Sequence, residues 1–222
     1  TEIYTLSLHD ALPICVFITF EGPEGSGKST HIRALKTYLE ARGIDVVLTR
    51  EPGGTPLGEA IRGLLQHDHS EAPVARAEVL LFLASRAQHV EQLIRPALAA
   101  GKWVLCDRFD DSTFAYQGYG RGFDLQELKA VNSFAIHGLR PDLTVLLDVM
   151  PETSRARLAA RQAVTATAPD RIEREAEDFH VKMRNGFLAL AQQEPHRFAV
   201  INTEREADCV AADVRAAVAR FF

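Results

Sequence analysis

The stretch FEGPEGSGKST at residues 20–30 constrains the fold more than any other part of the sequence. Within it, residues 22–29 follow the pattern G-x-x-x-x-G-K-[S/T], in which glycines let successive backbone N–H groups point inward at a helix N-terminus. An apolar, β-branched run at 15–20 precedes the loop, and a helical pattern at 28–42 follows it. This order predicts a strand, a phosphate-binding loop and a helix, and therefore a site for ATP or GTP.

Four further apolar runs alternate with helical patterns along the rest of the chain. The additional strands are predicted at 45–50, 103–107, 143–149 and 198–202. The additional helices are predicted at 57–66, 75–100 with a bend near Pro96, 125–138, from about 152 onward, 174–193 and 207–222. Five apolar strands separated by helices imply an α/β fold in which helices cover both faces of a parallel sheet.

Length and composition narrow the class of protein. A chain of 222 residues with 46% apolar residues fits one domain. A net charge of −5 argues against a nucleic-acid binder, and the absence of a run of 18 apolar residues indicates no membrane span. The spacing of Cys15, Cys106 and Cys209 matches neither a metal site nor a disulfide framework. We therefore expect a reducing, cytoplasmic setting.

Residues 1–15, TEIYTLSLHDALPIC, differ in character from the rest of the chain. They begin with Thr, and they lack the positively charged region of a signal peptide. The segment SLHDALPI resembles a translated sequencing adapter. We expect a non-native or disordered extension here, with a genuine frayed extension as the alternative, and a single folded domain over 16–222.

Two positions in the loop and one beyond it are expected to act on phosphate and metal. Lys28 is expected to reach the β- and γ-phosphates of a nucleotide, and the Ser29 hydroxyl to bind Mg²⁺. Asp107 ends the third predicted strand, where a carboxylate can hold Mg²⁺ or its water. The nucleotide-binding candidates are Gly22, Pro23, Glu24, Gly25, Ser26, Gly27, Lys28, Ser29 and Thr30. The alternative is a glycine-rich turn whose lysine merely faces water.

Three further segments predict a pocket for a second molecule. TREPGGTPLGE (49–59) follows the second predicted strand, and CDRFDDSTFAYQGYGRG (106–122) follows the third, where an open α/β sheet binds its ligands. In EVLLFLASRAQHV (78–90), Phe82 and Arg86 are four residues apart and share a helix face. A ring beside a guanidinium suits a planar base that carries a carbonyl acceptor. The alternatives are that Phe82 belongs to the core and that Arg86 is solvated.

Together with GPEGSGKST, these segments resemble the thymidylate kinase family in its bacterial form. The resemblance runs from about Cys15 to the C-terminus, and the pairing of REPGGT with DRF…S…AYQG is its most specific part. It implies transfer of the γ-phosphoryl group of ATP to dTMP, which gives dTDP and ADP. It also implies a three-layer α/β/α P-loop kinase fold with sheet order 2-3-1-4-5, and a homodimer.

The resemblance implies roles for individual residues. Phe82 would stack on thymine, and Arg86 would donate to thymine O4, so the amino group of cytosine would be rejected. Arg108 would bind the dTMP phosphate, Tyr116 would lie under the deoxyribose, and Glu24 would approach the 3′-hydroxyl. The other residues implied for the dTMP site are Glu51, Pro52, Ser112, Thr113 and Gln117. Simple packing by Tyr116 is an alternative to its role.

A lid is implied at about 152–174, a segment rich in arginine that contains the small, polar stretch QAVTATAPD. In the bacterial form the lid supplies an arginine that the phosphate loop lacks, and here no arginine follows Glu24. Arg161 is the first candidate and Arg171 the second. The candidates for catalysis are thus Lys28, Arg108, Arg161 and Arg171. The alternative is a charged helix followed by a loop.

Two other functions remain open from the residues. One is another nucleoside or nucleotide kinase, which acceptor comparisons would reveal. The other is a P-loop regulatory ATPase, which would hydrolyse ATP without an acceptor. The segment 106–122 argues against the ATPase, because a switch needs no aromatic base pocket.

Overall fold

A computed structural model describes residues 15–66, 72–165, 171, 172 and 174–222. Its centre is an all-parallel sheet in the order β2-β3-β1-β4-β5, which confirms the predicted order. The strands are β1 (Phe17–Glu21), β2 (Val46–Arg50), β3 (Trp103–Asp107), β4 (Leu143–Asp148) and β5 (Phe198–Asn202). The extension expected at 1–15 lies outside the described residues, apart from the exposed Cys15.

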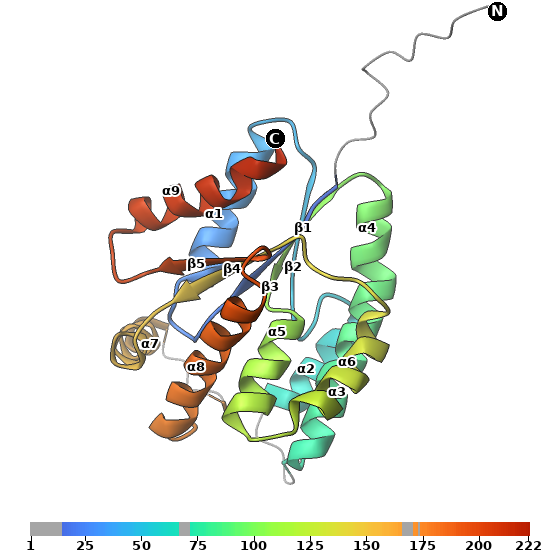
Figure 1. Ribbon diagram of the computed structural model, residues 1–222, viewed down its shortest axis with the longest axis vertical. Helices are drawn as coiled ribbons and strands as arrows, with labels where there is room; N and C mark the ends of the chain where they lie inside the picture. The colour runs from blue at the N-terminus through green and yellow to red at the C-terminus, as the bar shows by residue number, and fades with distance from the viewer. Residues whose placement is uncertain (1–14, 67–71, 166–170, 173) are drawn as a thin grey trace, which may run out of the picture.

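Helices connect the strands and cover the sheet (Figure 1). The first half of the chain contributes α1 (Lys28–Glu40), α2 (Pro56–Gln66), α3 (Ala75–His89), the π-helix η1 (Val90–Ile94) and α4 (Arg95–Ala99). The second half contributes α5 (Asp110–Thr113), the π-helix η2 (Phe114–Gly120), α6 (Leu125–Ile136), α7 (Pro151–Thr165), α8 (Glu177–Gln193), α9 (Ala207–Val218) and the 3₁₀-helix η3 (Ala219–Phe221). Within the described residues, none of these helices is both long and apolar enough to cross a membrane.

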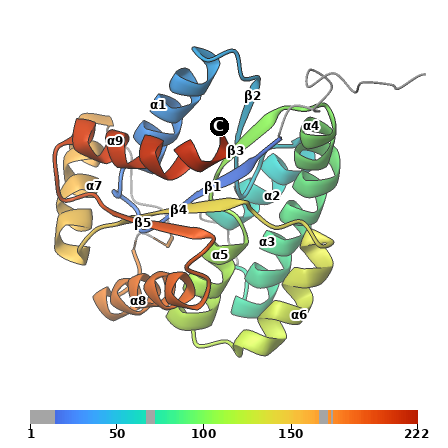
Figure 2. The same ribbon diagram turned by 45° about the horizontal axis from the view of Figure 1, so that its top comes forward.

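The sheet divides the interior into two layers, because alternate strand residues point to opposite faces. On one face, Ile18, Leu105 and Val145 pack against α1 and α9. On the other face, Phe17 and Val104 pack against η1 and α6, while β4 and β5 pack against η2 and α8. Figure 2 shows α1 and α9 on one side of the strands, and α3, α5, α6 and α8 on the other.

Apart from shifts of a few residues at the ends of other elements, three differences between the predicted and observed elements bear on the fold. The helix expected at 75–100 is divided by η1, which lies just before Pro96 in the first turn of α4; proline has no N–H to donate in a regular helix. The helix expected to start at Arg174 starts at Glu177. Residues 110–120 are helical, which their sequence did not indicate, because aromatic residues and glycine interrupt any regular apolar stripe.

A buried ion pair anchors α5 to the sheet. The guanidinium of Arg197 donates two hydrogen bonds to the carboxylate of Asp111, at 2.7 and 2.9 Å, and one to the hydroxyl of Thr144 on β4. All three side chains are buried. Removing one partner of such a pair would leave a buried charge uncompensated, at a cost of about 3–5 kcal/mol. The pair therefore fixes the helix that follows the third strand, where the acceptor residues were predicted.

Candidate active site

A cavity of about 650 Å³ lies at the carboxyl ends of the central strands. It joins the phosphate loop, the loop after β2, α3, α5 and part of α7. The predicted residues that line it are Glu24, Gly25, Gly27, Lys28, Ser29, Thr30, Glu51, Pro52, Phe82, Arg86, Asp107, Arg108, Ser112, Thr113, Tyr116, Gln117, Arg161 and Arg171. Gly22, Pro23 and Ser26 belong to the same loop but are not among the described lining residues. Residues expected for each of the two nucleotides thus line one cavity.

The phosphate loop requires glycine at two close approaches. Gly22 has φ +132°, and a Cβ there would lie 2.3 Å from the carbonyl oxygen of Leu147. Gly25 has φ +70°, and a Cβ there would lie 2.8 Å from the carbonyl oxygen of Ser154 on α7. Any larger residue would therefore push the loop away from β4 and α7.

Lys28 is buried and folds back over its own loop. Its Nζ donates to the carbonyl oxygens of Gly22 (3.0 Å) and Pro23 (2.8 Å), and lies 4.0 Å from the Glu24 carboxylate. Burial lowers the pKa of Lys28, and the charge of Arg108 lowers it further. The alternative of a lysine that merely faces water is therefore wrong, and the contact of Lys28 with nucleotide phosphates stays a prediction.

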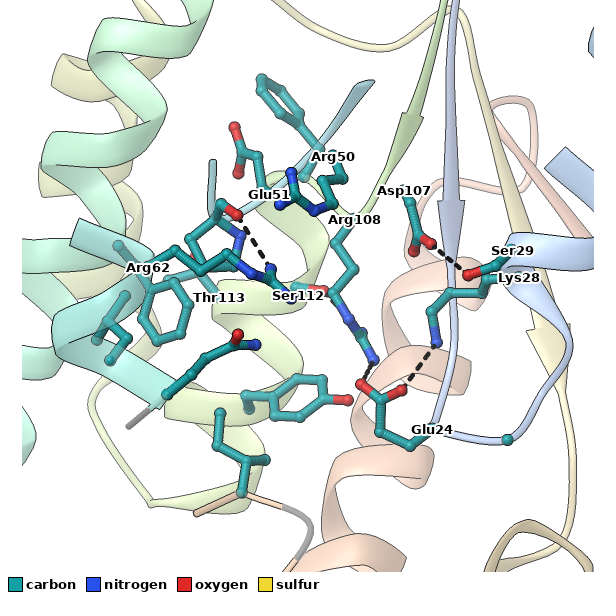
Figure 3. A pocket seen from close by; sticks show the side chains of 18 of the residues that line it. Glu24, Lys28, Ser29, Arg50, Glu51, Arg62, Asp107, Arg108, Ser112 and Thr113 are labelled. Carbon is teal, nitrogen blue, oxygen red and sulfur yellow. Dashed lines mark hydrogen bonds and ion pairs between the residues drawn. The ribbon is translucent and has the colours of Figure 1, made fainter. Parts of the chain in front are cut away.

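Arg108 adopts a left-handed backbone conformation, with φ +70°, directly after β3. Its N–H donates to Phe20 O, and its carbonyl accepts a hydrogen bond from the Cys106 thiol. Its guanidinium donates to the Glu24 carboxylate at 2.5 Å and to the Ser112 hydroxyl at 3.2 Å (Figure 3). Such a conformation is uncommon for a residue with a Cβ and is typical of functional sites.

Glu24 lies between two cations. Burial alone would raise its pKa, but the charges of Arg108 and Lys28 outweigh burial and hold the pKa of Glu24 well below its usual range. The charge of Arg161 also lowers it. At the phosphate end of the cavity, Glu24 therefore stays ionised, and the three cationic side chains that lower its pKa can bind anions.

Ser29 and Asp107 bring two oxygen ligands together. The Ser29 hydroxyl donates to the Asp107 carboxylate at 3.2 Å, as Figure 3 shows. Hydroxyl and carboxylate oxygens are ligands that Mg²⁺ accepts, usually together with water and substrate phosphates. The described part of the chain has no group of three or more His, Cys, Asp or Glu side chains suited to a metal. This pair thus fits an ion that a nucleotide helps to hold.

At the other end of the cavity, Arg86 is almost fully buried, and its guanidinium donates four hydrogen bonds. Its Nε donates to Glu51 at 2.8 Å, its Nη1 to Thr113 and Asn132 at 2.8 Å each, and its Nη2 to Phe109 O at 3.0 Å. The alternative of a solvated arginine is therefore wrong.

Two aromatic side chains complete this end. Phe82 is half-buried and lines the cavity, so it is not a fully packed core residue. The buried Tyr116 both packs and lines the cavity: its ring meets Phe179 and Phe187 edge-on at 6.1 Å, and the Arg108 guanidinium lies 5.0 Å from its centre. The packing alternative and the predicted position beside the ligand are thus both compatible with its place.

The sequence comparison agrees with this geometry. A family profile described as thymidylate kinase matches residues 20–214. The chain is 52% identical over 205 residues to the thymidylate kinase of Desulfovibrio desulfuricans, which covers 91% of this chain and 94% of that one. It is 47% identical over 201 residues to the thymidylate kinase of Pseudomonas putida, with 90% and 93% covered.

The chain belongs to the thymidylate kinase family. Its fold is also similar to the crystal structure of thymidylate kinase from Ehrlichia chaffeensis, with a TM-score of 0.74 and 36% identity over 92% of this chain and 98% of that one. The resemblance stated from the motifs is therefore confirmed.

In this thymidylate kinase family member, the arginines of the predicted lid lie in different places. Arg161 on α7 lines the cavity near Glu24. Its neighbour Arg157 donates to Gly25 O at 3.3 Å and to Thr203 O at 2.7 Å. Arg171 also lines the cavity but is bonded to the buried Glu78 on α3. The residues 166–170 and 173 of the predicted lid lie outside the described residues.

Sequence reasoning missed several residues of the cavity. Arg50 lines it and forms two 2.8 Å hydrogen bonds with Glu59, and Arg62 lines it and donates to Pro52 O at 3.1 Å. Arg50 could have been found, because it ends a strand as Asp107 does. Other lining residues outside the predicted set are Arg33, Leu65, Gln66, Phe109, Arg157 and Ile172. They lie on helices and turns whose direction the sequence does not fix.

Glu21, a buried residue that was not predicted for the site and does not line the cavity, supports the Arg108 turn. Glu21, at the end of β1, accepts hydrogen bonds from the Phe109 N–H at 2.8 Å and the Ser112 hydroxyl at 2.6 Å. Complete burial, with the nearby charge of Asp111, raises the pKa of Glu21 from 4.5 to about 8, although Arg108 and the two donors act in the opposite direction.

We expect Glu21→Gln to change how stability depends on pH. Between pH 4.5 and 8 the folded wild type holds a proton on Glu21 that the unfolded chain has lost. The stability that protonated Glu21 contributes to the fold is therefore fully present below pH 4.5. It falls as the pH rises from 4.5 and is lost once the pH passes 8. The wild type should therefore lose stability relative to the variant by up to about 1.4 kcal/mol per pH unit. Urea unfolding of both proteins between pH 5.5 and 8.5 measures this difference.

Asp110, whose burial raises its pKa to about 6, is present in both proteins, so the difference between the two curves isolates Glu21. Parallel curves would show that Glu21 is ionised throughout this range.

Proposed function

We propose that the cavity binds ATP and dTMP with their phosphates facing one another. The family's reaction is the ATP-dependent phosphorylation of dTMP to dTDP, and this is the reaction of the chain. The observation that carries the proposal is that Phe82 and Arg86 line the same cavity as Lys28 and Arg108. The aromatic ring and the guanidinium that suit a base thus line the same cavity as the loop that suits phosphates. Neither another nucleotide kinase nor a regulatory ATPase is favoured.

The donor phosphates bind at the loop over residues 22–30. Its backbone N–H groups lie at the N-terminus of α1, where partial positive charge favours anions. Lys28 exchanges its carbonyl partners for phosphate oxygens. Ser29 and Asp107 would hold Mg²⁺, which would supply positive charge to the β- and γ-phosphates.

The acceptor binds between α3 and α5. Phe82 stacks on thymine, Arg86 donates to its O4, and Pro52, Ser112, Thr113 and Gln117 line the pocket around it. Tyr116 lies under the deoxyribose, and Glu24 approaches the 3′-hydroxyl. Glu51 acts on the acceptor indirectly, through Arg86, because its two carboxylate oxygens are hydrogen-bonded to Arg86 and His89.

The transfer itself depends on position and charge. The acceptor is a phosphate dianion, so it needs no general base. Arg108 binds it and aligns it with the γ-phosphate, and Lys28 and Arg161 neutralise charge that spreads over the transferring group. Arg171, which is bonded to Glu78 away from the phosphate loop, is the second candidate for this last role.

Two further properties belong to the proposal. We place the protein in the cytoplasm, where its substrates are. We also propose a homodimer, because large apolar side chains are exposed on α2, α3 and α6, which pack side by side. These side chains are Leu57, Leu64, Leu80, Val131 and Phe134, the last of them 89% exposed. Exposed apolar groups gathered in this way are typical of protein interfaces.

The reaction is tested by ADP release from ATP and Mg²⁺ with dTMP, dUMP, dCMP or thymidine as acceptor. We expect rapid release with dTMP, little with dCMP or thymidine, and none when EDTA removes Mg²⁺. Lys28→Ala should lose the dTMP-dependent rate. Release that is equally fast without any acceptor would contradict the proposal and indicate an ATPase.

Arg161→Ala should lower kcat by roughly 10³-fold and change KM for ATP much less, since the guanidinium acts mainly in the transition state. Arg155→Ala is the matched control, because Arg155 lies on the same helix but is exposed and pairs with Glu177 at 2.9 Å. Steady-state kinetics of both variants measures the effect. An unchanged kcat for Arg161→Ala would exclude Arg161 and leave Arg171 as the candidate.

Phe134→Glu should convert the dimer to a monomer, because it introduces charge into the exposed apolar face of α6. Val164→Glu is the control: Val164 is 87% exposed on α7, away from α2, α3 and α6. Analytical ultracentrifugation measures the mass of each protein. A wild type that sediments as a monomer, or a Phe134→Glu variant that remains a dimer, would show that this face is not the interface.

A further inference from the structure

A chain of buried polar side chains leads from β2 to the acceptor end of the cavity. The Thr49 hydroxyl is 2.7 Å from His89 Nε2, and His89 Nδ1 is 3.1 Å from Glu51 Oε1. The other oxygen of Glu51, Oε2, accepts the 2.8 Å hydrogen bond from Arg86 Nε. All four side chains are buried, and His89 has no exposed surface at all. Glu51 and Arg86 were predicted for the acceptor site, but Thr49 and His89 were not.

The partners of His89 fix its tautomer. The Glu51 carboxylate can only accept, so His89 Nδ1 must carry the proton that lies between them. The Thr49 hydroxyl faces the other ring nitrogen. The imidazole therefore holds Glu51 by a hydrogen bond in a buried place, where such bonds are expensive to lose.

The loop after β2 packs directly on this imidazole. Gly54 has φ +79°, and a Cβ there would lie 2.6 Å from His89 Nε2 and 2.7 Å from Thr49 Oγ1. The Ser85 hydroxyl, one turn earlier on α3, accepts the Gly53 N–H at 3.2 Å. One face of α3 thus holds the loop that carries Glu51.

Arg86 has five N–H groups, and its bonds account for four of them among the described residues. The remaining N–H belongs to Nη2, and Arg86 lines the cavity. Because the guanidinium is planar and rigid, the four bonds determine the direction of the fifth N–H. The bond from Nε to Glu51 is the only one of the four that goes to a carboxylate, and hydrogen bonds between charged groups are the stronger ones. The position of Glu51 therefore contributes most to the direction of the guanidinium.

We propose that His89 is a positioning residue for the acceptor base. It holds Glu51 so that the last N–H of Arg86 faces the base carbonyl, which makes His89 part of the selection for thymine over cytosine. The inference rests on the proposed binding of dTMP in this cavity. Without His89, Glu51 Oε1 would lose its donor, and the carboxylate would turn and release Arg86 from its fixed direction.

His89→Leu, which keeps bulk but removes the donor, tests the proposal. We expect KM for dTMP to rise about tenfold, since one well-placed hydrogen bond to a charged group is worth about that factor. The kcat at saturating dTMP and KM for ATP should change less than about threefold. The inhibition constant of dCMP should not rise, because the amino group of cytosine accepts no bond from Arg86 that the variant could lose.

His89→Asn should restore most of the affinity for dTMP, because its amide N–H can reach the position of Nδ1. Val90→Ala is the matched control for stability. Val90 is equally buried and adjacent, but packs in the apolar layer against Val104 and Ile136. Val90→Ala should lower the melting temperature and leave KM for dTMP unchanged. If His89 had a purely structural role, His89→Leu would give this same result.

If His89→Leu does not fold, Thr49→Val decides the question, since it removes only the hydroxyl that faces Nε2. KM for dTMP should then rise by about threefold. An unchanged KM in folded His89→Leu, or in Thr49→Val where the first variant does not fold, would overturn the proposal. Failure of the proposed function would appear separately, as a wild type that shows no dTMP-dependent release of ADP.

Discussion

The geometry of the cavity depends on the parallel pairing of β1 with β3. Its register places Phe20 beside Asp107, so the phosphate loop and the Arg108 turn leave the sheet next to one another. The Arg108 N–H continues this pairing by donating to Phe20 O. Because Arg108 then takes a left-handed conformation, its side chain meets Glu24 across the gap between the two loops. The contacts of Ser29 with Asp107 and of Glu21 with Phe109 connect the same two segments.

Burial of charge at this junction is tolerated because cations and carboxylates alternate. Lys28 and Arg108 lie on either side of Glu24, and Arg108 also lies 3.9 Å from Glu21. A lone buried charge would be costly, and the low pKa of Glu24 shows that its ion pairs outweigh its desolvation. Glu21 shows the opposite balance, since burial prevails there and raises its pKa. Two carboxylates a few residues apart therefore differ in protonation at neutral pH.

The order of the sheet and most of the residues that line the cavity could be predicted from short segments of the sequence. The loop GPEGSGKS and the strand ends fix Lys28, Asp107 and Arg108 in space, because residues at the carboxyl ends of parallel strands converge. The helical spacing of Phe82 and Arg86 likewise predicted that both side chains share a helix face, and both line the cavity. Partners contributed by distant helices could not be predicted: nothing in the sequence shows that Asn132 on α6 meets Arg86. The same holds for Glu78, which anchors Arg171.

The proposed binding of two phosphorylated substrates to this cavity requires Lys28 and Arg108 to exchange hydrogen-bond partners. Lys28 donates to two loop carbonyls, and Arg108 donates to Glu24, so neither cation is bare before a nucleotide arrives. A phosphate that displaces these contacts meets side chains that the fold has already desolvated, which removes part of the cost of binding. Glu24, however, remains ionised and would repel a phosphate at the position its carboxylate holds. In the proposed complex it therefore turns towards a hydroxyl donor, and the 3′-hydroxyl of dTMP provides one.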